Sequence, residues 1–274
     1  MPMSEPMDDG GEATEEFWRD YILHGDPNER AKRRIFQRLP SAPRCKTCAA
    51  PFGGIGARAM RMIGIWPSGR NPSLCNTCYD FLRDHRGGAE IEITMLFADV
   101  RGSTALAERM SAGEFRGLLQ RFYHEATEAV FSHGGELDKF VGDEVVAMFM
   151  PVVCEDHHAA SGVAAARKTL RATGHGRPEG PWIPVGVGVH TGPAWVGTVG
   201  DASHVELTAL GDAVNVASRL ASVAVAGEVV VSDVTATAAG LDVHLPRTSV
   251  ELKGKELPLE VVRLREGRET LAAG

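Results

Sequence analysis

Two aspartates at the ends of apolar runs are the residues of this sequence best placed to do chemistry. Asp99 follows the apolar run 93–97, which predicts a buried strand, and Asp143 lies in a predicted hairpin over 138–149 (DKFVGDEVVAMF). Carboxylate oxygens bind Mg²⁺, which shares the rest of its coordination shell with substrate phosphate and water. Two aspartates at neighbouring strand ends are therefore expected to hold two divalent cations.

The hairpin also has a simpler explanation, a surface turn whose two bracketing charges, Lys139 and Asp143, form a salt bridge. A second carboxylate placed in much the same way upstream, Asp99, favours the cation site instead. The loop that follows Asp99 adds a candidate phosphate site. It combines a glycine turn with two hydroxyl side chains that can cap the next helix, at Gly102, Ser103 and Thr104. Loops that enter helix N-termini bind phosphate, because free backbone amides and the helix dipole face the ligand.

Four motifs occur in an order that resembles the class III nucleotidyl cyclase domain of bacterial adenylate cyclases. They are FADVRGST over 97–104, KFVGD over 139–143, TALGDAVNVASRL over 208–220 and LKGK over 252–255. The succession of predicted strands and helices favours an α+β architecture with an antiparallel-rich sheet. The resemblance covers roughly 91–265 and implies a ferredoxin-like βαββαβ core with additions.

The resemblance implies conversion of ATP to 3',5'-cyclic AMP and pyrophosphate, by attack of the ribose 3'-hydroxyl on the α-phosphate. Asp99 and Asp143, with the backbone carbonyl of Val100, would bind two Mg²⁺ or Mn²⁺ ions that help ionise the hydroxyl and stabilise charge. The phosphate loop would be formed by Gly102, Ser103 and Thr104.

The same resemblance assigns five further residues to the substrate. Arg219 would neutralise charge on the α-phosphate, Asn215 would orient the ribose and Lys253 would hold the terminal phosphates. Lys139 only donates hydrogen bonds, so it suits N1 of adenine, and the Thr208 hydroxyl can accept from the adenine amino group. ATP is thus favoured over GTP without GTP being excluded.

In this family the metal aspartates of one protomer meet the base-selecting lysine and the Asn-Arg pair of the other. We therefore expect a homodimer with two composite active sites. Two alternatives remain open: a non-catalytic nucleotide-binding regulator, and a nucleic-acid-binding or protein-binding cysteine module attached to a degenerate cyclase domain.

Four cysteines upstream of the cyclase-like region form two C-x-x-C pairs separated by 26 residues: Cys45, Cys48, Cys75 and Cys78. Such pairs can bring four thiolates to one tetrahedral centre. Zinc, an iron-sulfur cluster and a thiol redox pair all remain open, because sets of four cysteines serve both metals. Zinc would stabilise a small domain, whereas a cluster would make it a sensor.

Composition bounds the remaining functions of the 274-residue chain. Its net charge of -7 argues against broad nucleic-acid binding, and the sequence contains no run of 18 apolar residues. The acidic N-terminus lacks the basic residues of a secretory signal, which indicates a cytoplasmic protein. The basic segment 30–38 is expected to be a solvated helix face, with contact to an anionic membrane or an acidic surface as the alternative.

We expect six segments along the chain. They are a disordered acidic tail (1–16), an amphipathic basic helical segment (17–44), a four-cysteine metal-binding domain (45–84), a linker (85–90), the catalytic domain (91–265) and a C-terminal tail (266–274). Gly53 to Gly56 are expected to form a turn. His157 and His158, at the start of a predicted helix over 156–173, are expected to be exposed or to cap it.

Overall fold

The computed structural model describes residues 13–25, 27–39, 42–201, 204–252, 254–255 and 257–266. The chain forms two compact units. The first contains Met1–Glu92, Met150–Glu155 and Pro193–Gly211, and the second contains Ile93–Phe149, Asp156–Gly192 and Asp212–Gly274. Two long strands, β1 and β4, contribute residues to both units.

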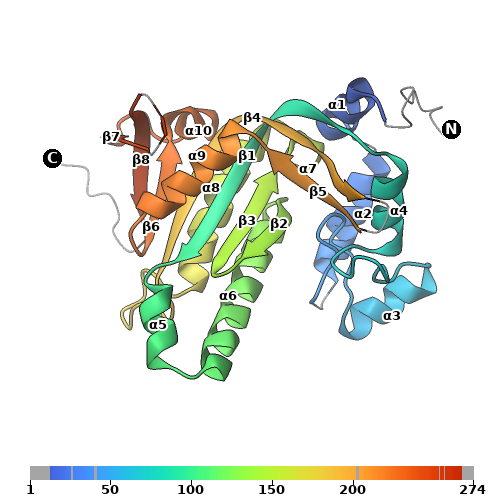
Figure 1. The fold of residues 1–274 in the computed structure, drawn as a ribbon, viewed down its shortest axis with the longest axis horizontal. Helices are drawn as coiled ribbons and strands as arrows, with labels where there is room; N and C mark the ends of the chain where they lie inside the picture. Colours follow the sequence, from blue (N-terminus) through green and yellow to red (C-terminus); the bar gives the residue numbers. More distant parts are fainter. Residues whose placement is uncertain are drawn as a thin grey trace. The chain divides into compact units, whose positions relative to one another are not determined.

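A mixed sheet forms the centre of the second unit, with strand order β2-β3-β1-β4-β6-β8-β7 (Figure 1). The β1-β3, β2-β3, β6-β8 and β7-β8 pairs are antiparallel, whereas β4 and β6 are parallel. The strands are β1 (Gly88–Val100), β2 (Glu136–Val141), β3 (Glu144–Phe149), β4 (Val185–Asp201), β6 (Glu228–Ser232), β7 (Arg247–Val250) and β8 (Leu259–Arg265).

Helices pack on this sheet in the order that the sequence predicts. α6 contacts β2 and β3, α8 contacts β3 and β6, and α9 contacts β6 (Figure 1). The helices of this unit are α5 (Ser103–Arg109), α6 (Ala112–Ser132), α8 (His158–Ala172), α9 (Asp212–Val223) and α10 (Asp233–Ala238). The succession β1-α6-β2-β3-α8-β4 gives the expected βαββαβ core and confirms the α+β class.

Local sequence explains where two of these helices lie. Ser111 and Glu114 form a capping box that starts α6, and Phe122 is fully buried on the sheet side of that helix. α9 approaches β4 so closely at Gly188 that a Cβ there would collide with the backbone nitrogen of Ala221. Only glycine allows this approach, which fixes the position of α9 on the sheet.

The first unit is a small helical domain joined to a β-hairpin. Its helices are α1 (Glu15–Leu23), α2 (Pro27–Arg38), α3 (Gly54–Met62), α4 (Asn76–Asp84) and α7 (Pro151–Cys154). The hairpin is formed by β5 (His204–Leu210), which pairs antiparallel with residues 195–201 of β4. Trp18, Ile22, Leu74 and Leu82 are completely or almost completely buried and form the core.

The structure corrects three expectations about the first unit. Ala13 is buried and its amide donates to the Arg86 carbonyl, while Thr14 caps α1, so residues 13–16 are ordered rather than part of a tail. β1 begins at Gly88, inside the predicted linker 85–90. α3 begins at Gly54, inside the glycine segment expected to form only a turn. Residues 1–12 and 267–274 of the two predicted tails lie outside the described residues.

No helix in the described part of the chain is long and apolar enough to cross a membrane.

Candidate active site

The two predicted metal ligands lie at adjacent strand ends of the second unit, Asp99 near the end of β1 and Asp143 in the turn before β3. Asp99 at the end of β1 is in register with Glu144, the residue after Asp143. The amide of Val100 donates to the carbonyl of Asp143 over 3.3 Å. The antiparallel pairing of β1 and β3 therefore brings the predicted ligand residues side by side, although 44 positions separate them in the sequence.

A cation already contacts one of these carboxylates. The Arg101 guanidinium pairs with Asp99 and also donates to the carbonyl of Ser222 over 3.2 Å. Burial lowers the pKa of Arg101. Sequence reasoning assigned no role to Arg101, although its place two residues after Asp99 in the same loop could have indicated one.

Negative charge accumulates at the start of β3. Burial, with a further contribution from the charge of Asp143, raises the pKa of Glu144 to about 7. Asp143 and Glu144 are both half-buried, as is Asp99. Half-buried carboxylate oxygens of this kind suit Mg²⁺ or Mn²⁺, and the pairing of Asp99 with Arg101 shows that this carboxylate attracts positive charge.

The loop after Asp99 differs from the prediction in how it starts the next helix. Gly102 is the N-cap of α5 and adopts a left-handed conformation with φ of 67°. Ser103 and Thr104 lie inside the helix, and no side chain caps it, so the prediction that their hydroxyls do so is wrong. The first-turn amides of α5 are consequently left without a side-chain partner.

The hairpin carries Lys139 near the end of β2. Its ammonium lies 3.4 Å from a carboxylate oxygen of Asp138, which is buried, while the Lys139 side chain is 43% exposed. A register shift in the β2-β3 pairing falls between Leu137 and Lys139. The shift leaves Lys139 accessible at the edge strand of the sheet.

α9 presents its two predicted substrate residues away from its core face. Val216 and Leu220 pack in a hydrophobic cluster with Leu252, whereas Asn215 is exposed and Arg219 is half-buried. This arrangement is the amphipathic pattern expected for the helix.

The loop that contains the LKGK motif lies against Arg219. A Cβ placed on Gly254 would lie 3.4 Å from Nη2 of Arg219. Lys255 of the same loop pairs with Asp212 at the start of α9, a contact that sequence reasoning missed. Lys253 lies outside the described residues, and the contact with the Arg219 guanidinium is made at Gly254.

Thr208, the other predicted base-selecting residue, lies in the first unit. It is buried in the middle of β5, where it pairs with Gly197 of β4. The structure thus brings Asp99, Asp143, Asn215, Arg219 and Lys139 into the second unit and places Thr208 on the hairpin of the first.

The four cysteines of the C-x-x-C pairs converge in the first unit. Their sulfur atoms all lie within 4.8 Å of one another, and the Sγ atoms of Cys48 and Cys75 are 3.7 Å apart. A tetrahedral ion with bonds of about 2.3 Å to sulfur places its ligands about 3.8 Å apart. The spacing therefore fits a single metal ion.

Backbone amides and neighbouring thiols favour negative charge on one sulfur atom of this centre, that of Cys45, while hydrogen bonds to Cys45 raise the pKa of Cys48 and Cys78. The amide of Cys75 donates to Sγ of Cys45 over 3.2 Å, and the amide of Cys78 donates to Sγ of Cys75 over 3.3 Å. Burial opposes ionisation of Cys45, but hydrogen bonds from the other three cysteines outweigh it and lower its pKa well below the usual value. Four sulfur atoms around a stabilised thiolate suit a soft metal cation.

Comparison with known proteins agrees with this geometry. Residues 89–264 match the family described as "Adenylate and Guanylate cyclase catalytic domain". An adenylate cyclase from Anabaena cylindrica is 37% identical over 132 residues, and adenylate cyclase 1 from Rhizobium meliloti (strain 1021) is 36% identical over 134 residues. Each match covers 47% of this chain but only 26% and 20% of the respective relative.

Two solved structures extend the comparison to the fold. The guanylyl cyclase Cya2 has a TM-score of 0.59 and 27% identity, covering 68% of this chain and 98% of its own. The adenylyl cyclase CyaB from P. aeruginosa has a TM-score of 0.55 and 28% identity, covering 68% and 99%. With the family match over most of the second unit's strands and helices, the chain belongs to the adenylate and guanylate cyclase catalytic domain family.

Proposed function

We propose that this chain is an adenylate cyclase that forms 3',5'-cyclic AMP and pyrophosphate from ATP. The observation that carries the proposal is the placement of Asp99 and Asp143 at adjacent strand ends, where the amide of Val100 donates to the carbonyl of Asp143, within a domain of the cyclase family. Adenylate cyclases are among the relatives with more than a third of matched positions identical, which favours ATP as the substrate.

Asp99 and Asp143, with the carbonyl of Val100, would hold two divalent cations. When bound, these cations supply a Lewis acid that lowers the pKa of the ribose 3'-hydroxyl and offsets charge on the phosphates. Arg101 pairs with the Asp99 carboxylate, so it would have to leave that carboxylate or share it when a cation binds. The first-turn amides of α5 after Gly102, which no side chain caps, would donate to the phosphate group as its charge develops.

Arg219 and Asn215 act on the other side of the nucleotide. Arg219 places its guanidinium on the α-phosphate, where charge increases during attack, and Asn215 orients the ribose. The proximity of Arg219 to Gly254 supports a shared anion site in which Lys253 binds the terminal phosphates.

Lys139 and Thr208 select the base. Lys139 donates to N1 of adenine and would meet an N–H donor on guanine, and Thr208 accepts from the adenine amino group. Because Asp143 and Lys139 lie only four residues apart in one hairpin but have separate roles in the family, we infer that two chains complete each other's sites in a homodimer. The exposed side chains of Phe140 and Val141 at the end of β2 suit burial in such an interface.

The cysteine centre binds zinc in this proposal. An iron-sulfur cluster distributes its cysteines over several irons, whereas the sulfur atoms here have the spacing of ligands to one ion. Zinc would hold together the two C-x-x-C loops of a unit with a small core.

The direct test is formation of cyclic AMP by the purified chain with ATP and Mn²⁺, compared with Asp99→Ala and Asp143→Ala. Each substitution should reduce kcat/KM at least about a hundredfold. Unchanged activity in either variant, or no cyclic product from the intact chain, would overturn the proposal.

Shared sites are tested by mixing. Asp143→Ala and Arg219→Ala chains should each be inactive, but a mixed dimer contains one intact site and should recover up to about a quarter of the activity for random pairing. Mixed dimers that form and stay inactive would contradict the composite arrangement while leaving the cyclase assignment intact.

A further inference from the structure

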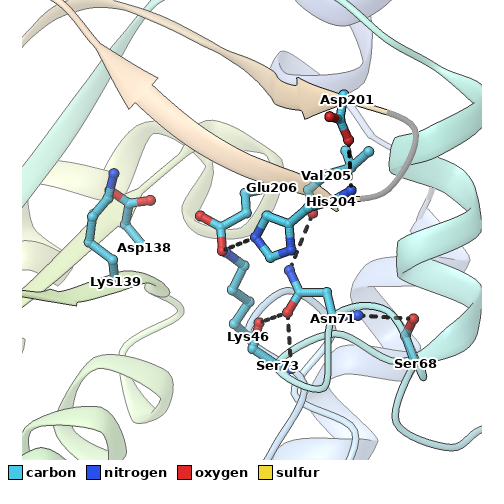
Figure 2. A network of polar contacts seen from close by, with 10 residues as sticks. All are labelled: Lys46, Ser68, Asn71, Ser73, Asp138, Lys139, Asp201, His204, Val205 and Glu206. Carbon is cyan, nitrogen blue, oxygen red and sulfur yellow. Dashed lines mark hydrogen bonds and ion pairs between the residues drawn. The ribbon is translucent and has the colours of Figure 1, made fainter.

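β5 is held by the cysteine-containing part of the first unit through a buried asparagine. Asn71 is 4% exposed, and its side-chain amide donates to the carbonyl of Val205 over 3.2 Å (Figure 2). Its side-chain oxygen accepts hydrogen bonds from both the amide and the hydroxyl of Ser73. The Asn71 side chain therefore has a fixed orientation that depends on Ser73.

A second contact joins the same parts. The ammonium of Lys46, whose side chain is 6% exposed, lies 3.9 Å from the carboxylate of Glu206 (Figure 2). Glu206 also contacts the ring of His204 at 3.3 Å, so the start of β5 carries a small polar network. A nearly buried lysine beside a carboxylate fixes the strand more firmly than a solvated pair would.

The two residues that contact β5, Lys46 and Asn71, lie close to the cysteines in the sequence. Lys46 follows Cys45, and its amide donates to the carbonyl of Ser73 over 2.9 Å. Ser73 lies two residues before Cys75. One backbone hydrogen bond thus joins the two C-x-x-C loops at the point from which Lys46 and Asn71 reach β5.

We propose that metal binding by Cys45, Cys48, Cys75 and Cys78 sets the order of β5 through Asn71 and Lys46, and thereby controls how well Thr208 discriminates adenine from guanine. The part about the nucleotide rests on the proposed function. Asn71 and Lys46 are positioning residues, because they act through the backbone and side chains of β5 and not on the substrate.

The physical basis is that a bound cation bonds the four sulfur atoms together, so metal loss lets the two cysteine loops separate. The Lys46–Ser73 hydrogen bond would weaken with that separation, and Asn71 would lose the partner that orients it. Val205 is three residues before Thr208 on β5. Loosening β5 at Val205 therefore reaches the residue that reads the base within one short strand.

The first readout is hydrogen exchange of the full-length protein, measured by mass spectrometry, with and without removal of metal by a chelator. Metal removal should speed exchange of peptides covering 204–210 about tenfold or more, while peptides covering β6 keep their rate. The variant Asn71→Ala, with metal bound, should give a similar increase in β5 without losing metal.

Asn76→Ala is the matched control. Asn76 is the first residue of α4 and follows Cys75, but its side-chain amide bonds only to Gly64 and Trp66 in the described part of the chain, not to β5. It should leave β5 exchange unchanged. Equal exchange of β5 in the metal-bound protein, the metal-free protein and Asn71→Ala would overturn the proposal.

The second readout is the ratio of kcat/KM for ATP to that for GTP. Asn71→Ala should lower this ratio about threefold to tenfold, with a smaller change in kcat for ATP, and Asn76→Ala should not change it. If the chain formed no cyclic nucleotide, the proposed function would fail, but the exchange measurements would still decide whether the metal orders β5. Faster exchange of β5 in Asn71→Ala with an unchanged ratio would refute control of base discrimination.

Discussion

Tyr123 of α6 donates a hydrogen bond from its hydroxyl to the carbonyl of Gly142, the residue before Asp143. Its ring stacks on Phe140, with 4.4 Å between ring centroids and 22° between planes. Gly142 has a φ of 60°, so the turn needs a residue that tolerates a left-handed conformation. Tyr123 of α6 therefore supports the turn before Asp143, the proposed metal ligand, through both its hydroxyl and its ring.

Tyr123→Phe should raise the Mn²⁺ concentration needed for half-maximal activity about threefold to tenfold, because the lost hydrogen bond frees the Asp143 turn. A titration of cyclic AMP formation with Mn²⁺ at saturating ATP measures this change. Tyr79→Phe is the control, since the Tyr79 hydroxyl is buried without a hydrogen bond in the described part of the chain. An identical metal requirement in Tyr123→Phe and the unmodified protein would refute the role.

The base-selection proposal predicts a change of substrate preference in Lys139→Glu combined with Thr208→Cys. A glutamate accepts from the N1–H of guanine, so the ratio of kcat/KM for ATP to that for GTP should fall by about 5- to 150-fold. Competition assays with both nucleotides measure the ratio. Lys168→Glu, a charge reversal on α8 at a lysine bonded to Ser132, should leave it unchanged.

The proximity of Asp99 and Asp143 could be predicted because both follow from strand patterning. The apolar runs 93–97 and 145–149 specify buried strands, and acids placed at their ends must meet if the strands pair. The convergence of the four cysteines could be predicted equally well, because C-x-x-C spacing is itself a geometric constraint. Both features depend on short-range patterns.

Features that depend on tertiary packing could not be predicted. His158 was expected to be exposed or to cap its helix, but it is buried and bonds to Thr94 across the sheet, a partner 64 residues away. The start of α5 depends on the left-handed Gly102, which overrides the capping preference of Ser103. The contact of Asn71 with Val205 joins residues 134 positions apart, and no local pattern marks it.

The metal proposal predicts about one zinc per chain and no visible absorption. Cys78→Ser removes one of four ligands and should reduce bound zinc and lower the unfolding temperature, whereas Cys154→Ser, outside the cluster, should retain both. Metal analysis and thermal unfolding of protein purified without added metal measure the two effects. A brown protein containing iron would replace zinc with a cluster at the same site.

His190 predicts how the stability of the second unit depends on pH. Burial lowers the pKa of His190 to about 4, and its Nδ1 lies 2.8 Å from the Ser232 hydroxyl. The His190 ring takes up a proton near pH 6.5 in the unfolded chain and only near pH 4 in the folded chain. The contribution of neutral His190 to the free energy of unfolding is therefore fully present above pH 6.5 and is lost as the pH falls toward 4.

Between pH 7.5 and pH 5 the loss from this one group should be about 2 kcal/mol. His190→Gln cannot take up the proton, so its free energy of unfolding should fall less over the same interval, by about that amount. Urea unfolding at the two pH values measures the difference, and His133→Gln, on a histidine that bonds to the Ala129 carbonyl at the end of α6, provides the control. If His190→Gln lost as much stability as the unmodified protein, the burial of a neutral His190 would not be the source of acid sensitivity.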